Sequence, residues 1–328
     1  MDIVVSGMRP TGKLHVGHFF GALKNWVSLQ KKYSCYYFIA DLHALTTNFE
    51  HPENIKEMRR EMVIDWLSVG VDIDKSVVFV QSQNIYHSEL FMFLSMVTPV
   101  SWLERCPSYK ELKSEFEKQG QDISNLGFLG YPVLMTGDII MYDAKYVPVG
   151  IDQLPHIEIS REIVRRFNSI YNRALFIEPE ALITDVPKLP GLDGRKMSKS
   201  YNNTILLSEE FKSVETKILR MKTDTNRKRR TDKGNPDICP VFDYHKVFST
   251  DDEKKEVVYG CRNAKIGCID CKKILIKHML EFLAPIQEKR AEYEKKIDDI
   301  DDLLKDSQNK ANKMAERKME LVKGTLKL

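Results

Sequence analysis

Residues 3–18 decide the fold class, and they read Ile-Val-Val-Ser-Gly-Met-Arg-Pro-Thr-Gly-Lys-Leu-His-Val-Gly-His. The apolar run Ile3–Ser6 predicts a buried strand. After a glycine-containing turn, apolar side chains recur at helical spacing, at Val16, Phe20, Leu23 and Val27. This spacing predicts a helix from about Val16 to Lys31.

The same alternation continues through the first half of the chain. Further strands are predicted at Cys35–Ala40, Val77–Val80 and Tyr146–Val149, and further helices at Pro52–Gly70 and Leu154–Asn168. Near-continuous apolar strands that alternate with helices indicate an α/β fold with a parallel sheet covered on both faces. Ligands of such sheets bind beyond the carboxyl ends of the strands, which makes Ser6–Leu14 and Asp41–Thr47 the segments where a site is expected.

The composition is that of a globular protein with about two domains. The chain has 328 residues, of which 42% are hydrophobic and 30% charged. These fractions exclude a disordered chain or a collagen-like fibre, and no apolar run approaches the roughly 18 residues of a membrane span. A formal net charge of +3 argues against a DNA-coating protein, so a polyanionic partner must meet local basic patches.

Cysteine usage bears on the cellular compartment. The six cysteines are Cys35, Cys106, Cys239, Cys261, Cys268 and Cys271. No secretory signal pattern precedes Ile3, so we expect a cytosolic, reducing compartment and no disulfide framework. Four of the cysteines lie between residues 239 and 271, and this clustering needs its own explanation.

The character of the chain changes near residue 190. Val186–Arg195 contains two prolines and two glycines, which indicates a domain junction. From Ser208 onward the pattern is helical and highly charged, and the stretch Arg220–Lys233 carries seven basic residues. The tail Ile286–Lys327 predicts charged surface helices. A basic stretch is usually a solvated face, but contact with the phosphates of a polyanionic partner is a second interpretation here.

The turn Pro10–His18, which we call the signature turn, has the features of an anion site. Gly12 and Gly17 allow a ligand to approach the backbone, and the helix that starts here offers free N–H groups to a phosphate. His15 and His18 can donate hydrogen bonds to phosphate oxygens. The alternatives are a glycine-rich connection with two incidental histidines, or half of a metal site.

A second segment, the lysine loop, reads Lys196-Met197-Ser198-Lys199-Ser200 and follows a glycine-containing loop. Two lysines so placed could hold a departing pyrophosphate electrostatically. Lysine-rich loops more often simply face solvent, so the segment alone is a weak signal.

Together and in this order, the two segments resemble the HIGH and KMSKS signatures of the class I aminoacyl-tRNA synthetases. Nearly end to end, the chain resembles bacterial-type tryptophanyl-tRNA synthetases. The segments that carry this resemblance are Ser6–Gly12, Asp41–Thr46, Tyr131–Met135, Asp138–Ile139 and Val147–Gln153.

The resemblance implies a domain plan and an activity. Residues 1–190 would form a Rossmann-like catalytic domain, residues 191–285 a helical anticodon-binding domain, and residues 286–328 C-terminal helices that return to the catalytic domain. The enzyme would activate L-tryptophan with ATP and Mg²⁺ and transfer the tryptophanyl group to tRNA(Trp). It would be a cytoplasmic homodimer without membrane or DNA partners.

The resemblance also implies residue roles. ATP would be bound by Arg9, Pro10, Thr11, Gly17, His18, Gly150, Ile151, Asp152, Leu189, Lys196, Met197, Ser198, Lys199 and Ser200. Tryptophan would be bound by Gly7, His43, Tyr131, Met135, Asp138, Val147, Val149 and Gln153, with Tyr131 and Gln153 at the α-ammonium group. The catalytic side chains would be His15, His18, Lys110, Lys196 and Lys199. Val5 stands where some relatives carry Phe.

Asp138 would accept the indole N–H. The residue lies among apolar neighbours that would desolvate its carboxylate, and a buried carboxylate needs a partner. A helix N-cap is the alternative role for this aspartate. Met135, Val147 and Val149 could equally be ordinary core residues.

The four clustered cysteines follow the pattern Cys239-x21-Cys261-x6-Cys268-x2-Cys271. Only the last pair has the short spacing of a metal knuckle, and four thiolates suit either zinc or an iron–sulfur cluster. A subset of tryptophanyl-tRNA synthetases has a similar spacing and carries a [4Fe–4S] cluster. The resemblance thus favours iron–sulfur first, zinc second and four unrelated thiols third.

Three other functions stay open at this stage. Tyrosyl-tRNA synthetase would use the same chemistry with another pocket. A non-catalytic tRNA-binding paralogue would not need both signatures intact. A different nucleotidyl transferase would not need the helical region, the basic stretch or the cysteines.

Overall fold

In this computed structural model the described residues are 1–106, 109–110, 113, 122–183, 189–297 and 299–328. Within them, one sheet has the strand order β3-β2-β1-β4-β5, and every neighbouring pair is parallel. The strands are β1 (Ile3–Met8), β2 (Ser34–Ile39), β3 (Ser76–Val80), β4 (Tyr146–Val149) and β5 (Glu180–Ile183). The predicted α/β fold with a parallel sheet is confirmed, and β5 is the strand that the sequence reading did not include.

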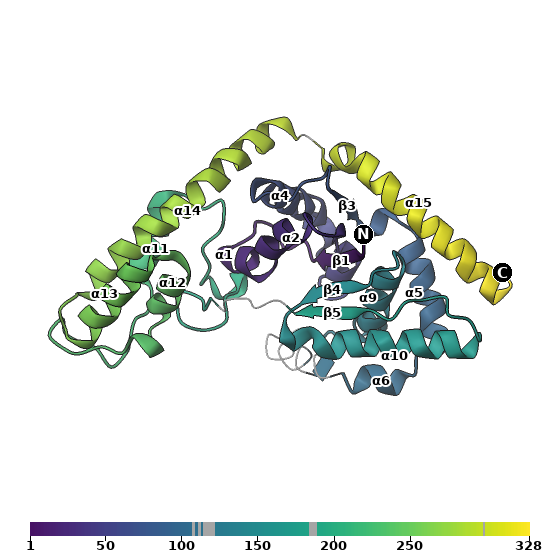
Figure 1. The fold of residues 1–328 in the computed structure, drawn as a ribbon, viewed down its shortest axis with the longest axis horizontal. Helices are drawn as coiled ribbons and strands as arrows, with labels where there is room; N and C mark the ends of the chain where they lie inside the picture. The colour runs from purple at the N-terminus through teal and green to yellow at the C-terminus, as the bar shows by residue number, and fades with distance from the viewer. Residues whose placement is uncertain (107–108, 111–112, 114–121, 184–188, 298) are drawn as a thin grey trace.

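Side chains on successive strand residues point to opposite faces, and each face has its own core. Val4 of β1 and Tyr37 of β2 belong to a core that includes Trp26 and Trp66. Val5 belongs to the other core, on the opposite face. Helices cover both faces, as the near-continuous apolar strands predicted (Figure 1).

The helices of the sheet-bearing region are α1 (Val16–His18), α2 (Lys24–Leu29), α3 (Asp41–Leu45), α4 (Ile55–Ser68), α5 (Tyr86–Val97), α6 (Val100–Glu104), α8 (Leu126–Leu129), α9 (Tyr131–Ile140) and α10 (Leu154–Ile170). The later helices are α11 (Phe211–Arg220), α12 (Pro240–Phe248), α13 (Asp251–Arg262), α14 (Cys268–Lys296) and α15 (Ile300–Leu326). Among the described residues, no helix combines the length and the apolar character needed to cross a bilayer.

The helix predicted at Val16–Lys31 is not one regular helix. A π-helical stretch, η1 (Phe19–Leu23), separates α1 from α2, and α2 ends at Leu29. Such π-helical insertions are rare and occur often at functional sites. The periodicity of the apolar residues could not reveal the insertion, because Phe20, Leu23 and Trp26 are buried all the same.

The C-terminal helix α15 covers the edge of the sheet at β3 (Figure 1). It packs against the edge strand β3, where the Ser307 hydroxyl accepts the Val78 N–H at 2.6 Å and the Gln308 side chain accepts the Val80 N–H at 2.8 Å. An unpaired strand edge would otherwise expose these donors. The tail was predicted as surface helices, but one face of α15 is buried in the core, with Ala311 and Ala315 fully covered.

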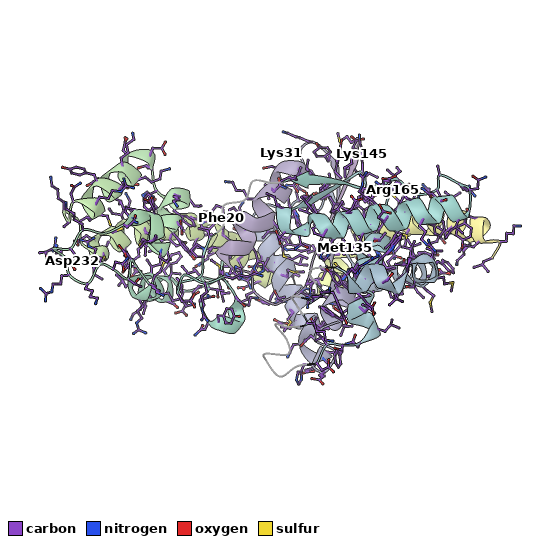
Figure 2. The ribbon with its side chains drawn as sticks, turned by 90° about the horizontal axis from the view of Figure 1, so that it is seen from below. Phe20, Lys31, Met135, Lys145, Arg165 and Asp232 are labelled. Carbon is purple, nitrogen blue, oxygen red and sulfur yellow. The ribbon has the colours of Figure 1, made fainter. Side chains whose placement is uncertain are left out.

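Helices α11 to α13 lie together at one end of the molecule, and α14 runs from them to α4 (Figure 1). Figure 2 shows Asp232 at the far end of this region and Met135 within the sheet-bearing part. The basic stretch Arg220–Lys233 is not helical beyond Arg220, contrary to the helical pattern expected from Ser208 onward. Position 285/286, where a domain boundary was expected, lies inside α14.

Candidate active site

The signature turn begins at the carboxyl end of β1. His15 is the residue before α1, and its ring stacks on that of His18 with centroids 3.7 Å apart. The His15 N–H donates to His18 Nδ1 at 3.2 Å, which fixes the second imidazole. Gly17 is required here, because a Cβ at this position would lie 2.9 Å from the His15 ring and 3.0 Å from Met197 Sδ.

Both imidazoles are neutral near pH 7. Burial first, and then the charge of Lys199, lower the pKa of His15 to about 4. Burial, His15 and Lys199 lower the pKa of His18 to about 3. Among the described residues, His15 Nδ1 is buried without a hydrogen-bond partner. A buried polar atom of this kind needs a partner, and a phosphate oxygen is a suitable one.

The structure brings the lysine loop against the signature turn. Lys199 Nζ donates to the Thr11 carbonyl oxygen. Gly12, which has a left-handed φ of +77°, lies beside the same ammonium group. Burial lowers the pKa of Lys199 to about 8. Lys196, by contrast, is exposed at the outer side of the loop.

Asn203 holds the lysine loop in shape, and the sequence reading missed it. Its Nδ2 donates to Asp193 Oδ1 at 2.8 Å and to the Lys196 carbonyl oxygen at 3.1 Å, while its Oδ1 accepts the Ser198 N–H at 2.8 Å. Gly191 permits this arrangement, since a Cβ there would lie 2.1 Å from Asn203 Nδ2.

A cavity of about 340 Å³ lies at the carboxyl ends of β1, β2 and β4, within the size range of small-molecule sites. It is lined by all eight residues predicted to bind tryptophan: Gly7, His43, Tyr131, Met135, Asp138, Val147, Val149 and Gln153. Arg9 and Gly150 of the predicted ATP set line it as well.

Asp138 lies in the last turns of α9 and is fully buried, so its alternative role as an N-cap is wrong. His43 Nε2 lies 2.8 Å from Oδ2, His87 Nδ1 lies 2.6 Å from Oδ1, and Gln81 Nε2 donates to both oxygens at 2.8 Å. Burial opposes ionisation of Asp138, but the bonds from the two histidines outweigh it and lower the pKa of the carboxyl.

Gln81 and His87 were missing from the sequence reading. Gln81 directly follows β3, so the rule about carboxyl ends of strands could have found it. His87 lies in the first turn of α5, six positions after Gln81, and its Nε2 lies 2.8 Å from the Tyr142 hydroxyl. No local sequence signal connects His87 with Asp138.

Phe38 is one of the aromatic side chains that line the cavity, with Trp26 and Tyr131. A Cβ on residue 7 would lie 2.3 Å from Cζ of the Phe38 ring, so a glycine is needed at position 7. Val5 and Phe38 both line the cavity. Some relatives were expected to carry Phe at the position of Val5. Phe38 thus supplies an aromatic surface next to Val5.

The remaining predicted residues lie around this centre. Thr11 and Pro10 belong to the signature turn, and Ile151 and Asp152 are exposed beyond β4. Leu189 is partly buried before the lysine loop. Lys110 is exposed. The ring of its neighbour Tyr109 packs against the ring of Phe128, which stacks on Tyr131 of the cavity.

The four clustered cysteines line one small cavity between α12, α13 and α14. All are free thiols. Cys268 and Cys271 are three positions apart and share one face at the start of α14. Gly234 is needed beside them, because a Cβ there would lie 2.6 Å from Cys261 Sγ.

Four thiols are a donor type that zinc and iron–sulfur clusters use. Burial and the three other thiols raise the pKa of Cys271 to about 12, and a metal would remove these protons. His245 Nε2 lies 3.2 Å from Cys271 Sγ, and Arg227 is 3.9 Å from Cys261 Sγ. Nevertheless, in the described part of the chain no group of three or more His, Cys, Asp or Glu side chains is arranged to hold a metal ion.

A parallel α/β sheet with these two signature segments in contact at its carboxyl edge defines a class I aminoacyl-tRNA synthetase. The family of "tRNA synthetases class I (W and Y)" matches residues 2–284. The tryptophan–tRNA ligase of Thermotoga maritima is 50% identical over 99% of both chains, and that of Aquifex aeolicus is 43% identical over 99% of both. A crystal structure of tryptophanyl-tRNA synthetase from Campylobacter jejuni, complexed with ADP and tryptophan, superposes with a TM-score of 0.87 at 33% identity and covers both chains fully.

The chain therefore belongs to the bacterial-type tryptophanyl-tRNA synthetases.

Proposed function

We infer that the protein is a tryptophan–tRNA ligase, which forms tryptophanyl-adenylate from L-tryptophan and ATP and then charges tRNA(Trp). One observation carries this conclusion. A cavity with a buried carboxylate acceptor, Asp138, lies directly beside two phosphate-binding segments that contact each other. Tryptophan-dependent ATP–pyrophosphate exchange, followed by charging of tRNA(Trp), tests it.

The first step needs no protein nucleophile, because the tryptophan carboxylate attacks the α-phosphorus of ATP. Catalysis then rests on positioning and on stabilisation of the charge that develops on the phosphates. We propose that His15 and His18 donate to the α-phosphate as neutral imidazoles. Lys199 and Lys196 would hold the departing pyrophosphate, and Lys110 would approach the phosphates from the other side. Mg²⁺ enters on the phosphates of ATP.

Recognition of the indole N–H requires an exchange of donors at Asp138. A carboxylate offers about four lone-pair sites, and protein donors already occupy them. Of these donors, only His43 lines the cavity, whereas Gln81 and His87 are fully buried behind it. We propose that the indole N–H replaces His43 and that Gln81 and His87 hold the carboxylate in place.

Lys199 gives the reaction a predicted alkaline limit. The ammonium is charged below its pKa of about 8 and neutral above it. Because kcat/KM for ATP reports the free enzyme, it should fall as pH rises through about 8, by up to tenfold per pH unit. Lys199→Arg, which keeps its charge, should remove this fall, and the exposed Lys196→Arg should not. A flat wild-type profile up to pH 9.5 would contradict the role of Lys199.

We propose that residues 191–285 bind the anticodon region of tRNA(Trp), with residues 1–190 as the catalytic domain and residues 286–328 returning to it. Six of the seven basic side chains of Arg220–Lys233 are exposed, which suits phosphate contacts, and only Arg227 is buried. The packing of α15 on β3 supports the return of the C-terminal residues to the catalytic domain.

We also propose that the protein is a homodimer. The exposed side chains of Met92, Met96 and Val100 offer an apolar surface for a second subunit.

We further propose that Cys239, Cys261, Cys268 and Cys271 hold a [4Fe–4S] cluster. In such a cluster each thiolate binds a different iron atom, so the sulfurs stand apart around a shared cavity. A zinc ion would instead draw all four to about 2.3 Å from one point. The observation that supports the proposal is that the four thiols line one shared cavity. The bound cluster would link α12, α13 and α14 and stabilise their packing.

Purification without oxygen should give brown protein with about four iron and four sulfide per chain. Cys268→Ser should lose most of the iron and lower the thermal unfolding temperature, because metal binding is coupled to folding. Cys106→Ala, a thiol outside the set, should retain the iron. Colourless protein with one zinc per chain would contradict the assignment.

A further inference from the structure

Three charged side chains are buried together behind the signature turn, and the chemistry proposed above does not use them. Glu61 and Asp65 lie on α4, and Arg290 lies on α14. The Asp65 and Arg290 side chains are 0% and 3% exposed. The Arg290 guanidinium donates to Asp65 Oδ1 with one nitrogen and to Glu61 Oε2 with another.

The second oxygen of Asp65 reaches the signature turn itself. Oδ2 accepts the backbone N–H of Leu14 at 2.6 Å, and Leu14 directly precedes His15. Burial raises the pKa of Asp65 to about 6, so the carboxyl is still ionised at neutral pH. Its negative charge also opposes the effect of burial on the pKa of Lys199. Asp65 thus acts on both segments of the proposed ATP site.

A second connection runs from the preceding turn of α14. Gln287 Nε2 donates to the carbonyl oxygens of Leu207 and Glu209 at 3.2 and 2.8 Å. The Leu207 N–H in turn donates to the Leu14 carbonyl oxygen at 2.8 Å. Gln287 and Arg290 are three residues apart and share one helix face. α14 is therefore connected to both backbone polar groups of Leu14. Arg290 is connected to the Leu14 N–H through Asp65, and Gln287 is connected to the Leu14 carbonyl oxygen through Leu207.

The other end of α14 carries Cys268 and Cys271. At about 1.5 Å per residue, a helix places Arg290 roughly 28 Å from Cys271. Pro285 interrupts the backbone hydrogen bonding of α14 between these residues, and the turn that bears Arg290 is held by its packing against α4. A misplacement of about 1 Å is enough to reduce a rate by about 100-fold when reacting groups must be aligned.

We propose that Asp65, Gln287 and Arg290 are positioning residues of the ATP-binding turn, which they hold through the two backbone polar groups of Leu14. This role rests on the proposed function. The competing explanation is that the buried pair only stabilises the fold. The two explanations differ in their effect on ATP kinetics per correctly folded active site.

The test is exchange kinetics, normalised to active sites by the burst of adenylate formation. In Arg290→Met we expect kcat/KM for ATP to fall about tenfold or more, while KM for tryptophan stays within about twofold. Arg290→Lys should recover most of the loss. Gln287→Leu, which leaves the buried charges intact, should change the same parameter in the same direction by about threefold. Glu294→Gln removes only the outer ion pair of Arg290 and should change neither constant.

The double variant Asp65→Leu/Arg290→Met separates the two explanations. Replacing both members of a buried pair by apolar side chains should restore part of the stability that Arg290→Met loses. The kcat/KM for ATP should stay low, because nothing accepts the Leu14 N–H. Recovery of activity in parallel with stability, or an unchanged kcat/KM for ATP in both Arg290→Met and Gln287→Leu, would overturn the proposal. Wild-type protein without tryptophan-dependent exchange would instead refute the function itself.

Discussion

Replacing Lys199 by methionine should lower kcat for tryptophan-dependent ATP–pyrophosphate exchange by about 10²–10³-fold, the usual loss when one preorganised charge-stabilising donor is removed. The Lys199 ammonium already lies against the signature turn, next to the Thr11 carbonyl and close to both histidines. It is therefore in place before ATP binds. Its charge would be used most in the transition state, when negative charge moves to the leaving pyrophosphate.

The KM for tryptophan should change by less than about twofold, because Lys199 does not line the cavity that contains Asp138. Lys75→Met is the matched control, since Lys75 is exposed and forms its ion pair with Asp72, outside the site. The control should have wild-type kinetics. A Lys199→Met enzyme whose kcat is reduced no more than that of the control would show that the lysine loop does not stabilise the departing group.

Asp138→Asn should lower kcat/KM for tryptophan by about 10- to 100-fold, which corresponds to one charge-assisted hydrogen bond of about 1.5–3 kcal/mol. The change is nearly isosteric, so the cavity keeps its shape. It removes the negative charge that accepts from His43, Gln81 and His87 and, in our proposal, from the indole N–H.

A tryptophan analogue in which sulfur replaces the indole N–H separates recognition from structure. The wild-type enzyme should reject this analogue strongly, since a buried acceptor is left without its donor. In Asp138→Asn the ratio of kcat/KM values for tryptophan and the analogue should shrink by at least tenfold. Equal losses for both amino acids would mean that Asp138 serves only to hold the fold.

The fold and the phosphate-binding segments could be predicted because their signals are local. β1 and the signature turn are adjacent in the sequence, and β1 to β4 are short apolar runs that can be found one at a time along the chain. β5 was missed because its four residues, Glu180–Ile183, carry no long apolar run, and η1 was missed because a π-helical insertion leaves the burial pattern intact.

Apart from Asn203, whose partners are within ten positions of it, the parts of the site that escaped prediction depend on contacts between distant residues. Arg290 and Asp65 are 225 positions apart, and His87 and Asp138 are 51 apart. A charged residue in a helix ordinarily reads as a solvated face, and nothing local marks Arg290 as buried. Only Gln81 had an available signal, because it follows a predicted strand at the edge where ligands bind.

The most direct measurement of the central claim is ATP–pyrophosphate exchange with purified wild-type protein, run in parallel with tryptophan and with tyrosine. The cavity presents a buried carboxylate for an indole N–H, beside the signature turn and the lysine loop. We predict rapid exchange with tryptophan and at least a 10³-fold lower kcat/KM with tyrosine, as expected when buried polar groups are left unpaired. Exchange with tyrosine alone, or with neither amino acid in folded, metal-loaded protein, would contradict the assignment.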